Sequence, residues 1–338
     1  MIKNYFRIAW RNLIKNKISS LINVGGLAVG MAVVMLIGLW IFDELSFDKY
    51  HKNYNRIAQV IQNVTNNGEV QTWFQTPYPL ANELRKSYGS DFKYVVMSVG
   101  VGNHILALGD KKLTKSGTFF EPQAPDMLSL KMLSGTRSAL KDPTSVLISE
   151  STAKAFFGDT DPMSKMLKID NQMNVKVAGV YEDLPKNSTF SDMAFMAPWD
   201  LFATTNQLDK MNEPWRPNFV SIYVLLADNA NLATVSQKIR DVKLRHVSAV
   251  LAKKKPALFL QPMSKWHLYD EFKNGINTGG RIQYVWLFGI IGIFVLLLAC
   301  INFMNLSTAR SEKRAREVGI RKAIGSLRSQ LIYQFFSE

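Results

Sequence analysis

Cysteine and histidine are scarce in this sequence of 338 residues. Cys300 is the only cysteine, so the chain cannot form an intrachain disulfide, and a thiol packed in an apolar segment is its expected role. The histidines show neither HxxxH nor HExxH spacing, which does not fit a zinc site. We therefore expect no metal and no cofactor. The histidines are His51, His104, His246 and His267.

Motifs of nucleotide binding and hydrolysis are missing as well. The sequence has no GxxxxGK phosphate loop and no GxSxG nucleophile elbow. The run from Gly100 to Ile105 contains two glycines but lacks the third glycine of a dinucleotide-binding turn. Acidic residues are scattered rather than paired. We assign no catalytic residue and expect that this chain is not itself an enzyme.

Acidic residues are outnumbered, at 27 against 41 lysines and arginines, which gives a net charge of +14. An even basic surface would indicate a nucleic-acid partner. Here the excess is concentrated at the two ends: residues 1–20 carry five basic and no acidic side chains, and residues 309–338 carry seven basic and three acidic ones. This distribution excludes nucleic acid as the preferred partner and is typical of cytoplasmic membrane flanks.

Two long uncharged runs lie just inside these basic ends. Residues 21–42 form a run of 22 and residues 282–308 a run of 27 without a charge. Each exceeds the ~20 residues that a helix needs to cross a bilayer. The first run is too long for a cleaved signal peptide, and Phe42-Asp43-Glu44 is no cleavage site. The sequence predicts two transmembrane helices, both termini in the cytoplasm and residues 43–281 outside.

The region between the spans alternates short strands with helices. Runs rich in Val, Ile and Tyr predict strands, and amphipathic runs predict helices, one of them begun by Ser149 and ended by Gly158. We expect a large α+β extracytoplasmic domain of two subdomains, with a break near 122–125 or 198–217. The expected strands are 56–64, 94–99, 146–149, 175–181 and 220–226, and the expected helices are 77–88, 149–157 and 231–251.

The N-terminal segment and the first span carry two weaker signals. Residues 2–17 place a basic stripe opposite an apolar face with Trp10, which predicts an amphipathic helix lying on the membrane surface rather than a simple extension of the span. Gly26 and Gly30 are spaced for close helix packing within the membrane.

The segment after the second span has an apolar stripe at Ile320, Ile324, Leu327 and Leu331, interrupted by glycines. Such a helix can rest on lipid headgroups through its Lys and Arg residues, or it can be the handle that a cytoplasmic partner grips. The physical pattern leaves both readings open.

The same segment closely resembles ABC transporter permeases of the MacB/FtsX type, and the core of the resemblance is Arg316-Glu-Val-Gly-Ile-Arg-Lys-Ala-Ile-Gly325. Residues 145–162 and 175–184 resemble the external signatures of that family, and residues 9–17 resemble its N-terminal motif. One departure is Pro162-Met-Ser164-Lys165, where the family has Pro-x-Gly-Lys.

The resemblance implies a function. The chain is expected to be the inner-membrane permease subunit of a MacB-like ABC transporter, coupling ATP hydrolysis by a partner ATPase to motion of its periplasmic domain, for efflux or mechanotransmission. It is expected to be multi-pass, the front part of a longer permease, and to work as a homodimer or pseudo-dimer in the lipid bilayer, with a periplasmic adaptor or outer-membrane partner as a further candidate. The expected coupling residues are Arg316, Glu317, Val318, Gly319, Ile320, Arg321, Lys322, Ala323, Ile324 and Gly325.

These readings divide the chain into five parts. The main alternative is a two-span sensor or receptor with an extracytoplasmic ligand-binding domain, which would need heptads running on from the second span. A membrane-tethered hydrolase lacks a nucleophile constellation. The expected parts are 1–18, an interfacial helix; 19–42, the first span; 43–281, the periplasmic core domain; 282–306, the second span; and 307–338, a coupling-helix segment leading toward a third span.

Overall fold

The computed structural model describes residues 17–323, which belong to two compact units. One unit contains the two long helices, and the other is an α+β unit, Glu44–Ile282. The interfacial helix expected at the N-terminus lies almost wholly outside the described residues, and so do Ile324 and Gly325 of the expected coupling motif. The two units are described separately below.

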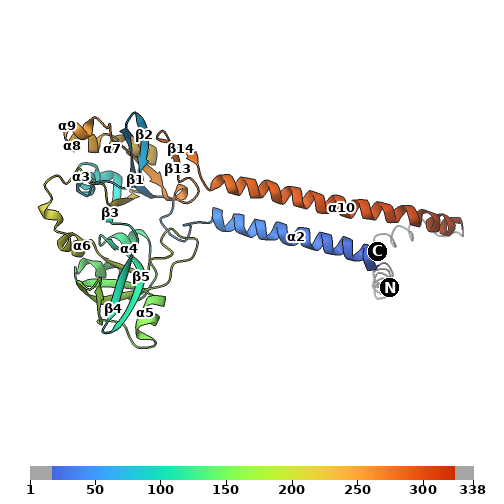
Figure 1. Ribbon diagram of the computed structural model, residues 1–338, viewed down its shortest axis with the longest axis horizontal. Helices are drawn as coiled ribbons and strands as arrows, with labels where there is room; N and C mark the ends of the chain where they lie inside the picture. The colour runs from blue at the N-terminus through green and yellow to red at the C-terminus, as the bar shows by residue number, and fades with distance from the viewer. Residues whose placement is uncertain (1–16, 324–338) are drawn as a thin grey trace. The chain divides into compact units, whose positions relative to one another are not determined.

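The helical unit is built from α2 (Lys17–Leu45) and α10 (Ile282–Ala323), which Figure 1 draws in blue and red. Both contain a stretch apolar enough to cross a membrane, Val24–Leu45 and Ile282–Asn305. Only 6% and 17% of the most apolar 18-residue window in each stretch is buried within the chain, whereas the core helix of a soluble protein is mostly buried. The helices are transmembrane spans, as the sequence predicts.

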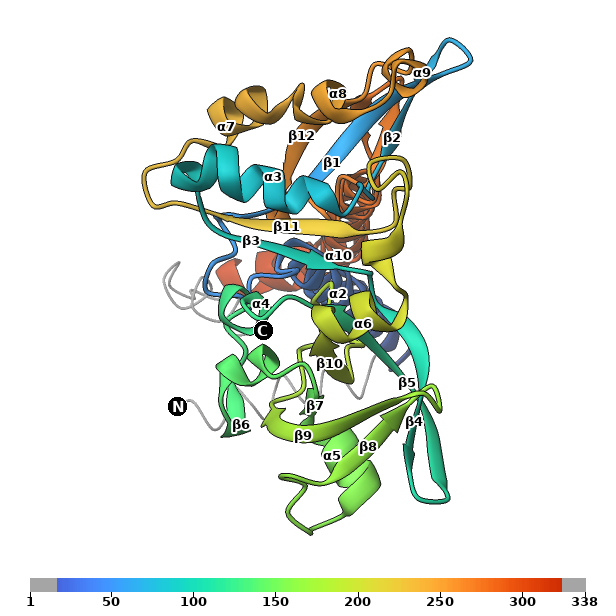
Figure 2. The same cartoon turned by 90° about the vertical axis from the view of Figure 1, so that its left-hand side faces the viewer.

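The first lobe of the α+β unit is a four-stranded antiparallel sheet in the order β3-β11-β1-β12. Along the chain its elements follow the split β-α-β pattern of ferredoxin-like folds, and Figure 2 shows the helices together on one face of the sheet. The elements are β1 (Ile57–Asn66), α3 (Pro79–Tyr88), β3 (Phe92–Ser98), β11 (Ser221–Leu226), α7 (Leu232–Ile239), α8 (Val242–His246) and β12 (Ala257–Pro262).

Side chains of this sheet alternate between two hydrophobic cores. On β11, Ile222 and Val224 pack with the helices, whereas Tyr223 and Leu225 face the opposite core. Both faces are buried, so the strand reads as a continuous apolar run without the alternation of a half-exposed strand. This is why β-branched and aromatic content, and not alternation, identified the strand in the sequence.

The second lobe is a closed ring of six strands in the order β5-β4-β8-β9-β7-β10, since β10 also pairs with β5. Its interior is filled by a separate core that includes Leu106, Phe119, Val177 and Phe195. The strands are β4 (Gly102–Leu108), β5 (Lys111–Phe120), β7 (Ser145–Ser149), β8 (Met166–Ile169), β9 (Met173–Tyr181) and β10 (Phe195–Pro198).

Shorter elements surround the two lobes. Strand β6 pairs with β9, β2 pairs with β1, and β13 and β14 form a separate hairpin. They are β2 (Glu69–Trp73), α4 (Ala124–Met127), β6 (Met132–Gly135), α5 (Glu150–Phe157), α6 (Trp199–Thr205), α9 (Ala249–Ala252), β13 (Glu271–Lys273) and β14 (Ile276–Gly279), with 3-10 turns at 89–91, 137–141, 208–210 and 263–265.

The chain leaves the first lobe after Ser98 and returns at Ser221, and these two serines are paired across β3 and β11. The second lobe is therefore an insertion between neighbouring strands of the first. The break predicted near 198–217 coincides with the returning connection. The alternative break predicted near 122–125 does not coincide with either connection between the lobes, because these residues lie at the start of α4.

Local sequence signals determine the ends of α5. Ser149 Oγ accepts a hydrogen bond from the Thr152 N–H, and Gly158 follows the helix with a φ of 60°. The single helix expected over residues 231–251 is wrong: three short helices, α7, α8 and α9, cover that range. The first break falls at Arg240, whose carbonyl accepts from Leu258 N–H on β12 and so joins the sheet edge instead of the helix.

Candidate functional site: the spans and the residues that join them to the α+β unit

Glycines set the distance between α2 and α10. A Cβ built on Gly30 would lie 2.8 Å from the Ala299 Cβ, and one on Gly26 would lie 3.2 Å from Asn302 Nδ2. In contrast, a Cβ on Gly25 or Gly38 would meet no described atom within 4 Å. Gly26 and Gly30, singled out by their spacing, thus lie on the α10-facing side of α2, where the absence of a side chain allows close approach.

The expected coupling motif continues the second span without a break. Helix α10 has 42 residues and runs from Ile282 through Arg316, Glu317 and Val318 to Gly319, Ile320, Arg321, Lys322 and Ala323. At ~1.5 Å per residue it is ~63 Å long, about twice the hydrocarbon thickness. The helix is not interrupted at Gly319, where a Cβ would meet no described atom within 4 Å. The motif and the span therefore form one rod.

Within the α+β unit, Glu44 and Phe47 hold the segment that follows the first span. His267 Nε2 donates a hydrogen bond of 2.6 Å to the Glu44 carboxylate. The Phe47 ring stacks on the same imidazole, with centroids 3.6 Å apart and planes within 2°. The N–H of Ile282, where α10 begins, donates to the Leu268 carbonyl. The two chain segments that lead to the spans are thus joined next to His267.

A buried polar network around Asp48 fixes the same segment. The Asp48 carboxylate accepts from the Thr189 N–H at 2.7 Å, from Thr189 Oγ1 at 2.6 Å and from Ser188 Oγ at 3.2 Å. His51 lies within hydrogen-bond distance of Ser188 Oγ and of the Leu128 carbonyl, at 3.1 and 2.8 Å. Burial lowers the pKa of His51, which favours the neutral imidazole.

This network contains Ser, His and Asp but does not have the geometry of a hydrolase. The aspartate bonds to the serine rather than to the imidazole, and Ser188 is only 1% exposed. Its role is to anchor the turn after α2 to the loop at Ser188. In the sequence Asp48 is only an acidic residue shortly after the first span, and nothing local to it indicates a partner 140 residues away.

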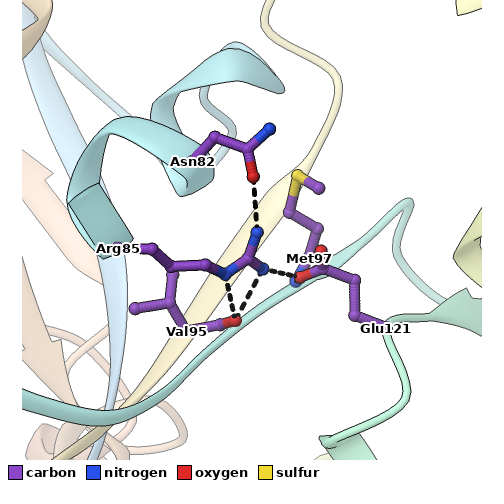
Figure 3. Close-up of polar contacts among 5 residues, drawn as sticks. All are labelled: Asn82, Arg85, Val95, Met97 and Glu121. Atoms are coloured by element: carbon purple, nitrogen blue, oxygen red, sulfur yellow. Dashed lines mark hydrogen bonds and ion pairs between the residues drawn. The ribbon is translucent and has the colours of Figure 1, made fainter. Parts of the chain in front are cut away.

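A second polar cluster joins the two lobes (Figure 3). Arg85 of α3 forms an ion pair with Glu121, which follows β5, and its guanidinium also donates to the Val95 carbonyl at 2.7 Å. The Glu121 carboxylate accepts from the Met97 N–H at 2.8 Å. Burial raises the pKa of Glu121 above its ordinary value although Arg85 lies beside it. Strands β3 and β5 share only the pair Ser98 and Phe120, so this cluster adds polar contacts to a junction that otherwise depends on hydrophobic packing.

Among the residues that the structure describes, no group of three or more His, Cys, Asp or Glu side chains is placed to hold a metal ion. The features described above are structural: two packed helices, one long continuous helix, and hydrogen-bonded contacts that fix the chain segments next to the spans.

The comparisons with known proteins agree with this arrangement. Residues 20–242 match the MacB-like periplasmic core domain, and residues 289–338 match the FtsX-like permease C-terminal domain. The chain therefore belongs to the MacB-like family of ABC transporter permeases, and its α+β unit is the periplasmic core domain.

Individual relatives are distant. The macrolide export ATP-binding/permease protein MacB of Aggregatibacter actinomycetemcomitans is 24% identical over 98% of this chain and 49% of its own length. MacB of Mannheimia succiniciproducens is 25% identical over 60% of this chain and 28% of its own length. The chain thus spans about half, or less, of these relatives. A solved domain of a putative permease protein from Porphyromonas gingivalis is 23% identical in sequence. The match covers 63% of this chain and 91% of that domain, and its TM-score of 0.53 shows that the two share a fold.

Proposed function

We propose that this chain is the permease part of an inner-membrane ABC transporter that transmits conformational change from a cytoplasmic ATPase to its periplasmic domain. Both termini lie in the cytoplasm in this proposal, as the basic flanks at residues 1–20 and 309–338 indicate. The chain supplies no phosphate loop, so ATP hydrolysis belongs to a partner subunit or domain.

The observation that carries the proposal is the continuity of α10. One helix joins Ile282, at the edge of the periplasmic domain, to the motif Arg316–Ala323. A displacement of the cytoplasmic end is therefore carried to the outer end without passing through a loop. The joint at Glu44, Phe47 and His267 supports the same proposal. It holds the segment after the first span at His267, and the carbonyl of the next residue, Leu268, accepts from the N–H of Ile282 at the start of the second span.

The motif Arg316–Gly325 acts as the coupling helix in this proposal, and the working unit is a homodimer or pseudo-dimer of permease halves in the bilayer. Efflux and mechanotransmission are the two forms of work that this arrangement supports. A periplasmic adaptor or outer-membrane partner would receive the motion of the core domain.

Gly319 offers a sharp test. A Cβ at this position would meet no described atom within 4 Å, and glycine costs about 1 kcal/mol in a helix interior, so Gly319→Leu should not destabilise α10. If the helix docks in an ATPase cleft, the added side chain should uncouple the two proteins. We expect Gly319→Leu and Glu317→Lys to abolish permease-dependent stimulation of the ATPase in proteoliposomes, while membrane insertion remains normal.

The matched control neutralises Arg321 and Lys322 together, a change that weakens headgroup binding but adds no bulk. Loss of stimulation in this control, with normal coupling in Gly319→Leu and Glu317→Lys, would show that the segment is a lipid anchor and would refute the coupling role.

A further inference from the structure

A pocket of about 450 Å³ opens in the periplasmic domain beside the joint at His267. Aromatic rings of Phe47, Phe74, Tyr223 and Trp266 contribute to its wall. Every residue that lines it belongs to the α+β unit, and its size is within the range of small-molecule sites. Neither the family assignment nor the proposed coupling role accounts for it.

The pocket wall contains a buried acceptor that lacks a donor. Gln261 is 3% exposed, and its Nε2 donates to the Tyr269 carbonyl at 3.0 Å. This bond fixes the amide, because the reverse orientation would set two acceptor oxygens against each other. Its Oε1 is buried without a donor among the described residues. A buried acceptor left unpaired is destabilising, and a ligand that donates a hydrogen bond would satisfy it.

Two opposite charges also line the pocket. The Asp270 carboxylate and the Arg281 guanidinium are exposed, and neither makes an ion pair or a side-chain hydrogen bond within the described chain. An aromatic wall beside a carboxylate favours an ammonium group, and a free guanidinium favours a phosphate. Together they match a ligand that carries both charges.

Chain connectivity keeps two of the lining residues close to the ends of the span helices. Phe47 follows the end of α2 by two residues, and Arg281 immediately precedes α10. At ~3.6 Å per residue, both lining residues are held within ~10 Å of the outer ends of the spans. We propose that this pocket binds a phosphoammonium head group, with primary ammonium preferred, since a primary ammonium can donate to Gln261 Oε1 and a quaternary one cannot.

The test uses the full chain in a non-ionic detergent and short-chain dihexanoyl phosphatidylethanolamine as the probe, with binding followed by calorimetry. Saturable binding is expected, weakened about tenfold by Asp270→Asn or by Arg281→Gln through loss of one charge-assisted contact. Dihexanoyl phosphatidylcholine should bind about tenfold more weakly than the ethanolamine lipid.

Two further sets of measurements complete the test. One supplies control variants, and the other distinguishes a lipid from a soluble compound as the source of the head group. The variants Asp110→Asn and Lys112→Gln change exposed charges on the β4–β5 hairpin, which contributes no residue to the pocket, and they should bind as the unaltered chain does. Equal binding of glycerophosphoethanolamine would support the site and assign it to a soluble compound, whereas binding of the lipid alone would assign it to the membrane. Absence of saturable binding, or equal binding by the Asp270 and Arg281 variants, would overturn the proposal.

Discussion

Ser164 shows how one residue departs from its family and what that departure costs. It stands where the resemblance predicts glycine, and its φ is 62°, in the left-handed region that favours glycine. Its N–H donates to the Val177 carbonyl at 2.8 Å, so the fold holds this conformation in place. A residue other than glycine in this region costs ~1–2 kcal/mol.

Ser164→Gly should therefore stabilise the α+β unit. Relief of the left-handed strain is partly offset by the greater conformational entropy of glycine in the unfolded chain, so we expect a net gain of about 0.5–1 kcal/mol in the free energy of unfolding. Urea unfolding of residues 44–282 measures the change. Ser138→Gly, at an exposed site with ordinary φ in a 3-10 turn, should be destabilising. A stability gain in both variants, or in neither, would contradict the argument from φ.

Lys243 is a buried cation that has no carboxylate partner among the described residues. Its Nζ donates to Gln62 Oε1 and Asn218 Oδ1, each at 2.6 Å, and burial lowers its pKa to about 8. The unfolded chain keeps the proton until about pH 10.4. Between these values the unfolded state binds more protons, so the stability of the folded state rises with pH.

We expect the free energy of unfolding of residues 44–282 to gain about 2 kcal/mol from this group between pH 7.5 and 9.5. The range stops there because burial raises the pKa of Tyr181 and Tyr223, and ionisation of these tyrosines in the unfolded chain then opposes the gain. In Lys243→Met this part of the slope should vanish. An unchanged slope in that variant would show that Lys243 titrates normally.

At the scale of elements, replacing a glycine of α2 should change the spacing of the two helices only where that glycine faces α10. Gly30→Leu would force its side chain against Ala299 and separate the spans, whereas Gly38→Leu meets open space. In a Cys300→Ser background, cysteines at positions 37 and 292 should cross-link, because Ile37 Cγ2 lies 3.5 Å from the Cβ position of Gly292. The Gly30 variant should reduce the cross-link yield several-fold.

Gly38→Leu is the matched control and should cross-link normally. Equal yields in the two variants would mean that Gly30 does not set the helix spacing. Because the leucine is compatible with a transmembrane helix, insertion into the membrane should be unaffected in both cases.

Elements differ in how far the sequence predicts them. The spans and α5 were predictable because their signals are local: charge-free length, an N-cap serine and a terminal glycine. Short strands such as β8 and β10 were not, since only their pairing in the closed ring makes them strands. The joint at His267 was equally hidden, because Glu44 and His267 lie 223 residues apart.

At the scale of the whole molecule, the periplasmic domain has its own cores and should fold without the spans. Within it, Arg85 and Glu121 connect the two lobes. Arg85→Met leaves a buried carboxylate unpaired and should destabilise residues 44–282 by about 2 kcal/mol at pH 7.5. At pH 5 the loss should be smaller, because Glu121, with its raised pKa, can take up a proton.

Adding Glu121→Gln to Arg85→Met removes the unpaired charge and should restore part of the lost stability. Urea titrations of the two single variants and the double variant complete a cycle that isolates the pair. Additive effects would show that the two side chains do not interact.

The pairing of Ser98 with Ser221 has a consequence for the history of this fold. The whole second lobe enters and leaves through two residues that lie opposite each other on neighbouring antiparallel strands, as the two ends of a hairpin loop do. An ancestral hairpin at this place could acquire, lose or exchange a lobe of any size without a change of register in the sheet. Diversification among relatives should therefore concentrate between these serines. A short turn grafted across them would expose Tyr223 and Leu225, so any lobe transplanted from another permease must cover that face of the sheet.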